Sequence, residues 1–143
     1  MPTQNLQNHT QSVPAFLALG LVLLIALIGA VVNLFNSIGD HQRIYSASLL
    51  VVLTLCVLVT AFFARTFALK VQDRAIRAEE NLRHFALTGK LLPSSLTIHQ
   101  IVSLRFASDS EFPALAAEAV SKKLAPRMIK ENVKSWRADT YRA

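Results

Sequence analysis

Histidine and carboxylate side chains are the groups in this sequence whose types suit metal binding or proton transfer. The four histidines are scattered along the chain, and none has a partner at the spacing of a metal-ligand pair. They are His9, His41, His84 and His99. His41 follows Asp40 directly, but two adjacent polar residues are typical of a turn rather than of a cation site. The sequence therefore predicts no metal centre and no cofactor.

Motifs for nucleophilic catalysis and phosphate binding are absent from the sequence. It contains only four glycines, none of them close together, so it has neither a glycine-rich phosphate loop nor a GxSxG turn. We predict that the carboxylates belong to charged helix faces rather than to a catalytic pair. We therefore expect a protein that is not an enzyme and that has no small-molecule substrate.

His84 allows two interpretations. A histidine can act as a pH sensor. His84 also follows Glu80 by four residues, the spacing of a charged pair on the exposed face of a helix. We favour the exposed pair.

Two long apolar runs without a charged residue dominate the N-terminal half. A helix rises about 1.5 Å per residue and the hydrocarbon core of a bilayer is about 30 Å thick, so about 20 apolar residues cross it. We predict a helical hairpin with a first transmembrane helix at 14–35, an external loop at 36–43 and a second transmembrane helix at 44–64. The polar tail at 1–13 contains no Lys or Arg, and the first run exceeds the roughly 7–15-residue core of a signal peptide, so we expect the first span to be retained.

Charged residues are confined almost entirely to the C-terminal half. Of the 15 Lys and Arg and the 9 Asp and Glu, only Asp40 and Arg43 precede Arg65. Cytoplasmic flanks of membrane helices are enriched in Lys and Arg, so we expect the region after the second span to be cytoplasmic. Two spans return the chain to its starting side, which makes both termini cytoplasmic. The net charge is +6, and the basic segment that follows the second span, with Arg65, Lys70 and Arg74, also suits an anionic inner leaflet.

The spans offer packing surfaces rather than an ion pathway. Charged and histidine side chains inside spans mark ion and proton pathways, and neither run contains Asp, Glu, Lys, Arg or His. Small and polar side chains recur in the first span at spacings of three and four, which lets membrane helices approach closely. These helix-packing candidates are Ala26, Ala30, Asn33 and Ser37. A small permease component or an oligomeric channel is an alternative function, and it predicts that substitutions of Asn33 and Thr54 change the flux. The candidate polar positions in the spans are Asn33, Ser48, Thr54 and Thr60.

The second helix is predicted to continue past the membrane as a cytoplasmic stalk at 65–88. No Gly or Pro interrupts this segment, and Gly89 and Pro93 follow it, as is typical of a helix end. Apolar residues recur in the stalk at alternating spacings of three and four, which is a heptad pattern. They are Ala68, Val71, Ala75, Ala78, Leu82 and Phe85.

The apolar residues of the stalk have two possible packing partners. In a parallel pair of copies, Arg74 would face Glu79 of the partner chain at the positions that flank the seam. Alternatively, the apolar residues pack on the C-terminal part of their own chain. We favour the second, because about three heptads make only a modest coiled coil.

The segment 89–143 is predicted to form a small cytoplasmic module of short helices without strands. The helices are expected near 98–107, 110–124 and 126–140. Thr97 with Gln100, and Ser108 with Glu111, have the spacing of capping boxes before the first two. The fold class is therefore all-α.

The last predicted helix carries basic residues beside a tryptophan. A basic amphipathic helix with Trp can lie on the inner leaflet, although packing in the core of the module is the alternative that we favour. The lipid-facing candidates are Lys130, Lys134, Trp136 and Arg137. Nucleic acid is not an expected partner, because the basic residues lack interleaved aromatics and no DNA-binding motif is present.

Charged residues in the stalk and in the segment 105–112 are candidates for contact with a partner protein. They are Arg74, Arg77, Glu79, Glu80 and Arg83 in the stalk, and Arg105, Asp109 and Glu111 in the later segment. The same side chains could equally form salt bridges within the chain.

Three sequence stretches carry a resemblance to a known family. FALKVQDRAIRAEENLRHF at 67–85, LRFASDSEFPAL at 104–115 and PRMIKENVKSWRAD at 126–139 resemble an uncharacterised family of short bacterial membrane proteins with two predicted spans. The resemblance implies a location in the bacterial inner membrane and supplies no catalytic residue. Some members of that family are labelled as ABC transporter permeases, but two spans without a coupling motif are too few for a permease.

The functional hypothesis is a non-enzymatic integral membrane protein that acts by helix packing, as an accessory subunit or scaffold of a membrane complex. Its expected partners are the lipid bilayer and other membrane protein subunits or a second copy of itself. The alternatives are the transport role and a membrane-tethered regulator that binds anionic lipid through the basic cytoplasmic part.

Overall fold

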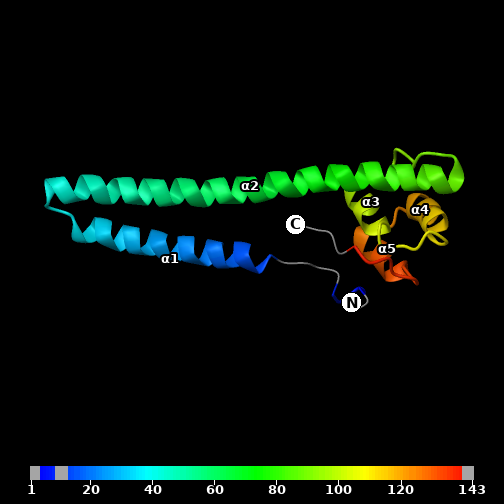
Figure 1. Ribbon diagram of the computed structural model, residues 1–143, viewed down its shortest axis with the longest axis horizontal. Helices are drawn as coiled ribbons and strands as arrows, with labels where there is room; N and C mark the ends of the chain where they lie inside the picture. The colour runs from blue at the N-terminus through cyan, green and yellow to red at the C-terminus, as the bar shows by residue number, and fades with distance from the viewer. Residues whose placement is uncertain (1–3, 9–12, 140–143) are drawn as a thin grey trace. The chain divides into compact units, whose positions relative to one another are not determined.

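The computed structural model describes residues 4–8 and 13–139, and within them it contains five helices and no strand (Figure 1). The helices are α1 (Pro14–Asn36), α2 (His41–Thr88), α3 (Ile98–Leu104), α4 (Phe112–Ser121) and α5 (Pro126–Asn132). The prediction of an all-α fold is confirmed. The chain divides into two compact units, Ser12–Ala68 and Met1–Gln11 together with Leu69–Ala143. His9 and most of the tail at 1–13 lie outside the described residues.

The unit Ser12–Ala68 consists of α1, a short turn and the first part of α2. Pro14 lies in the first turn of α1, where its missing N–H costs no hydrogen bond. Gly39 adopts a φ of 101°, which allows the chain to turn. The carboxylate of Asp40 then accepts hydrogen bonds from the backbone N–H groups of Gln42 (3.1 Å) and Arg43 (3.2 Å). This cap starts α2 at His41, earlier than the predicted span.

Both long helices have the length and apolar composition needed to cross a membrane. No residue of α1 is buried, and large apolar side chains are exposed along α1 and the first part of α2. Of the helix-packing candidates in α1, Ala26 and Asn33 are exposed and Ala30 is half-buried, while Ser37, the residue that follows α1, is buried. The Ser37 hydroxyl donates to the Asn33 carbonyl oxygen over 2.8 Å, so it is satisfied within its own helix turn.

The helix α2 continues without interruption through the predicted stalk, and it ends at Thr88 as expected. Gly89 has a φ of 71°, and its N–H donates to the carbonyl oxygen of Phe85 over 2.8 Å. A residue with positive φ at this place is the usual way to terminate an α-helix, and glycine adopts it without steric cost.

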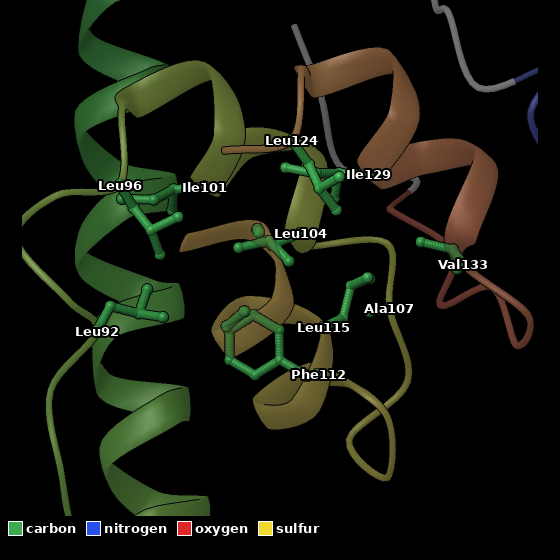
Figure 2. Close-up of a cluster of buried hydrophobic side chains, with 12 residues drawn as sticks. Leu92, Leu96, Ile101, Leu104, Ala107, Phe112, Leu115, Leu124, Ile129 and Val133 are labelled. Atoms are coloured by element: carbon green, nitrogen blue, oxygen red, sulfur yellow. The ribbon is translucent and has the colours of Figure 1, made fainter. Parts of the chain in front are cut away.

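The module after α2 has its own apolar core, supplied by α3, α4, α5 and their connections (Figure 2). The core residues are Leu92, Leu96, Ile101, Leu104, Ala107, Phe112, Leu115, Ala116, Ala119, Leu124, Ile129 and Val133. The predicted capping box before α3 is present: the Gln100 N–H donates to the Thr97 hydroxyl (3.3 Å) and the Thr97 N–H to the Gln100 side-chain oxygen (2.8 Å). No α2 residue belongs to this core.

The last helix is much shorter than predicted. The sequence suggested a helix near 126–140, but α5 ends at Asn132. Beyond it, the Glu111 carboxylate accepts hydrogen bonds from the backbone N–H groups of Lys134 (3.2 Å) and Ser135 (3.1 Å). The Arg137 N–H donates to the Phe106 carbonyl oxygen over 2.7 Å, and an isolated β-bridge joins Ala107 to Trp136. These bonds replace the helical ones, so the predicted basic amphipathic helix is wrong over its second half.

The other two module helices are also shorter than predicted. α3 ends at Leu104 rather than near residue 107, and α4 covers Phe112–Ser121 rather than 110–124. The Glu111 side chain does accept from the Ser108 N–H (3.2 Å), as in a capping box. However, the Ser108 hydroxyl contacts Ser110 instead, and α4 begins only at Phe112.

Candidate interaction surface

The apolar heptad residues of the stalk are exposed. We call Val71, Ala75, Ala78, Leu82 and Phe85 the apolar stripe; all five belong to the unit with the module. The exposed fraction is 67% for Val71, 68% for Leu82 and 51% for Phe85. Ala68, the first residue of the predicted pattern, is exposed as well. The favoured prediction that these residues pack on the C-terminal module is therefore wrong.

The module contacts the opposite side of α2. Successive helix residues are rotated by about 100°, which places Ile76, Glu80 and His84 on the side away from the apolar stripe. These three are the buried residues of α2 between Leu69 and Thr88. The His84 and Phe112 rings meet edge to face with centroids 5.8 Å apart. The module thus covers a largely polar face and leaves the apolar face uncovered.

Arg83 makes the principal connection between α2 and the module. Its guanidinium donates to Asp109 Oδ1 (2.7 Å), to the Ala107 carbonyl oxygen (2.7 Å) and to Glu80 Oε2 (2.9 Å). It also lies over the Phe112 ring, with its central carbon 4.4 Å from the ring centroid. The other Glu80 oxygen is 3.7 Å from Arg137 Nη1. The planar guanidinium of arginine carries several N–H donors in a rigid arrangement, which lets Arg83 bind these acceptors of α2 and of the module at the same time.

Two further partner-contact candidates hold the module together internally. Arg105 is buried, its Nε lies 3.1 Å from Asp139 Oδ2, and its guanidinium carbon is 4.5 Å from the Phe106 ring centroid. Glu111 binds the backbone of the segment after α5, as described above. Of the eight charged candidates, the structure therefore brings five into intrachain contacts, namely Glu80, Arg83, Arg105, Asp109 and Glu111.

The remaining three, Arg74, Arg77 and Glu79, are exposed. Arg74 and Glu79 flank the apolar stripe on its two sides, because they precede Ala75 and follow Ala78 directly. Within the residues that the structure describes, neither Arg74 nor Glu79 forms a salt bridge. Both charges are therefore available beside the stripe.

A shallow hollow of about 430 Å³ lies on the stripe near the end of α2. Its lining comprises Ala78, Leu82 and Phe85 from the stripe, with Asn81 and Leu91. The Asn81 side-chain oxygen accepts from the Leu92 N–H over 2.9 Å, which holds the chain after Gly89 beside α2. Leu91 and Asn81 were missed by the sequence analysis. Asn81 could not be identified from the sequence, because its hydrogen-bond partner lies 11 residues later and no local pattern marks such a pair. The apolar pair Leu91 and Leu92 can be recognised in the sequence, but its position beside α2 cannot.

His84 is a buried residue rather than an exposed one. Its Nδ1 lies 2.7 Å from the Lys90 carbonyl oxygen and 3.2 Å from the Thr88 hydroxyl. Glu80 contacts Arg83 and Arg137 instead, so the predicted Glu80–His84 pair is wrong. His41 and His99 are exposed at the starts of α2 and α3. The described part of the chain contains no group of three or more potential metal ligands.

The lipid-facing candidates do not form one helical row. Trp136 is half-buried, and its ring centroid lies 5.0 Å from that of Phe106. Lys130 is the only one of the four on α5, with its Nζ 5.8 Å from the Phe106 centroid. Lys134 and Arg137 are exposed in the extended segment that follows.

Comparison with known proteins identifies a family but no function. The family model DUF6526, described as a family of unknown function, matches residues 1–143. No curated protein and no solved structure matches the chain significantly. The full-length match agrees with the resemblance found in the 67–85, 104–115 and 126–139 stretches, and the chain belongs to this uncharacterised family of unknown function, DUF6526.

Proposed function

We propose that this protein is a non-enzymatic integral membrane protein that acts as an accessory subunit or scaffold, and that the apolar stripe of α2 is its contact surface. The observation that carries the proposal is the exposure of Val71, Leu82 and Phe85 on the face of α2 away from the module. A row of exposed apolar side chains beside an intact core is typical of an interaction site.

The membrane location is supported by α1 and by the first part of α2. Their long apolar surfaces are uncovered within their unit, and a bilayer would shield them from water. The hairpin topology is supported by Arg65, whose guanidinium carbon lies 5.7 Å from the Phe16 ring centroid. This contact joins the end of the second apolar run to the start of the first. In the other unit, the Asp139 N–H donates to the Gln4 side-chain oxygen over 2.7 Å, which favours both termini on one side.

The experiment that tests the proposal is purification of the tagged full-length chain from native bacterial inner membranes in mild detergent, followed by mass spectrometry and a native mass measurement of the eluate. We expect the wild-type eluate to contain a stoichiometric partner protein or to have the mass of more than one copy of the chain. Leu82→Glu should abolish this association, because it places a charge in the stripe. Met128→Glu is the matched control, since Met128 is 49% exposed and lies on α5. A wild-type protein that elutes as a monomer without a partner would contradict the proposal.

A further inference from the structure

We propose that the partner of the apolar stripe is a second copy of this chain, and that the two α2 helices associate in parallel and in register along Val71–Phe85. This inference rests on the proposed function, because anchoring in one membrane gives both copies the same orientation. The membrane anchors alone are therefore enough to make the two stalk helices run in the same direction.

The spacing of the stripe fits a two-stranded seam. Its residues alternate spacings of four and three, so Ala75 and Leu82 take the a positions and Val71, Ala78 and Phe85 the d positions of a heptad. The two central alanines allow the helices to approach closely. The exposed side chains at both ends of the stripe supply the apolar area.

The charges of Arg74 and Glu79, which flank the stripe, attract each other between two copies only when the helices are parallel and in register. Arg74 takes a g position and Glu79 the following e position, and in a parallel in-register pair g faces e′ five residues later. Arg74 of each copy then meets Glu79 of the other, and the two-fold axis generates the pair twice. Both side chains are exposed and, among the described residues, have no salt-bridge partner.

The hollow on the apolar stripe can accept a side chain of the second copy, as in the knobs-into-holes packing of coiled coils. Ala78, Leu82, Phe85 and Leu91 line it together with the polar Asn81, so a side chain of the second copy can enter a largely apolar hollow. The module leaves this surface uncovered because it binds the opposite side through Arg83. The contacts of Arg83 with the module are therefore separate from the residues that the seam uses.

Cysteine cross-linking in membranes tests the inference. In isolated membranes of a Cys56→Ala background, treated with copper phenanthroline as the oxidant, we expect Ala78→Cys to form a disulfide-linked species of twice the chain mass, because facing d positions bring the sulfurs within bonding distance. Arg77→Cys is the control, since Arg77 is exposed on the same helix but outside the stripe. It should form at least about fivefold less of this species.

Charge exchange then tests the register. Arg74→Glu alone, and Glu79→Arg alone, should each lower the yield of the Ala78→Cys dimer by about fivefold, since two exposed pairs become repulsive. The double variant Arg74→Glu/Glu79→Arg should restore the yield, which a merely structural effect would not do. Equal yields in all four proteins would overturn the proposed register.

The identity of the cross-linked species separates this inference from the proposed function. A species of twice the chain mass supports both. A species that contains a different membrane protein overturns the second copy as occupant but keeps the interaction surface. If Ala78→Cys gives no cross-linked species with an added thiol cross-linker and the wild-type chain elutes alone, both proposals fail.

Discussion

The Arg83 guanidinium donates to the Ala107 carbonyl oxygen over 2.7 Å, which joins α2 to the segment between α3 and α4. The same group binds Asp109 and Glu80. A charged side chain therefore makes the junction that an apolar stripe was expected to make. Because the module contacts α2 through Arg83, the apolar stripe remains uncovered. Its exposure is the basis of the functional proposal.

Replacement of Arg83 should loosen the module from α2. In Arg83→Gln, the buried Glu80 carboxylate loses the nearer of its two ion-pair partners among the described residues and keeps the more distant Arg137, and breaking a largely buried ion pair costs about 3 kcal/mol. We expect faster limited proteolysis after Gly89 and a lower Tm of the module. Arg77→Gln, which removes an exposed charge from the same helix, should leave both unchanged. Equal proteolysis of the two variants would contradict the role given to Arg83.

Replacement of Leu104 in the module core should lower the free energy of unfolding much more than replacement of Leu82 in the apolar stripe. Leu104 is fully buried in the module core, so Leu104→Ala should lower the free energy of unfolding by about 2–5 kcal/mol. Leu82 is 68% exposed, and Leu82→Ala should change the stability of the dissociated chain by less than about 0.5 kcal/mol. Urea unfolding in dilute detergent measures both. A large loss in Leu82→Ala under these conditions would mean that the stripe is covered within the chain.

Glu111 should control the extended segment after α5. Glu111→Ala removes the acceptor of the Lys134 and Ser135 N–H groups, so hydrogen exchange at these two amides should accelerate by about tenfold or more. Glu118→Ala is the control, because the Glu118 carboxylate pairs with the exposed Lys122 side chain on the surface of α4. Unchanged exchange in Glu111→Ala would show that the segment is held by other contacts.

The topology can be tested with single cysteines in the Cys56→Ala background. Ile38 is 67% exposed in the turn between α1 and α2, whereas Ser37 is buried, so Ile38→Cys is the better external probe. An impermeant thiol reagent applied to intact cells, with the outer membrane permeabilised, should label Ile38→Cys. Ser121→Cys at the end of α4 should be labelled only after the inner membrane is opened. The reverse pattern would overturn the predicted orientation.

The long elements follow from local properties of the sequence. α2 is uninterrupted because no Gly or Pro occurs between His41 and Thr88, and Gly89 ends it through its positive φ. The Thr97–Gln100 capping box likewise starts α3 through bonds between residues three apart. Such signals lie within a few residues of one another, so they can be recognised without the fold.

The errors arise where distant residues decide the outcome. α5 ends early because Glu111 binds backbone groups more than 20 residues later in the chain, which overrides the amphipathic pattern. The stripe was expected to cover the module, but the module closes its own core without any α2 residue. Its docking by Arg83 depends on Ala107 and Asp109, which periodicity along α2 cannot reveal.

Site-specific photo-cross-linking in intact cells tests the central claim most directly, because it reports what lies against the apolar stripe in the native membrane. A photoreactive amino acid would replace Leu82 in one variant and Arg77 in another, both in the full-length chain. We predict a discrete adduct in the membrane fraction from position 82 and none from position 77. An adduct from position 77 alone, or from neither position, would contradict the assignment of the stripe as the interaction surface.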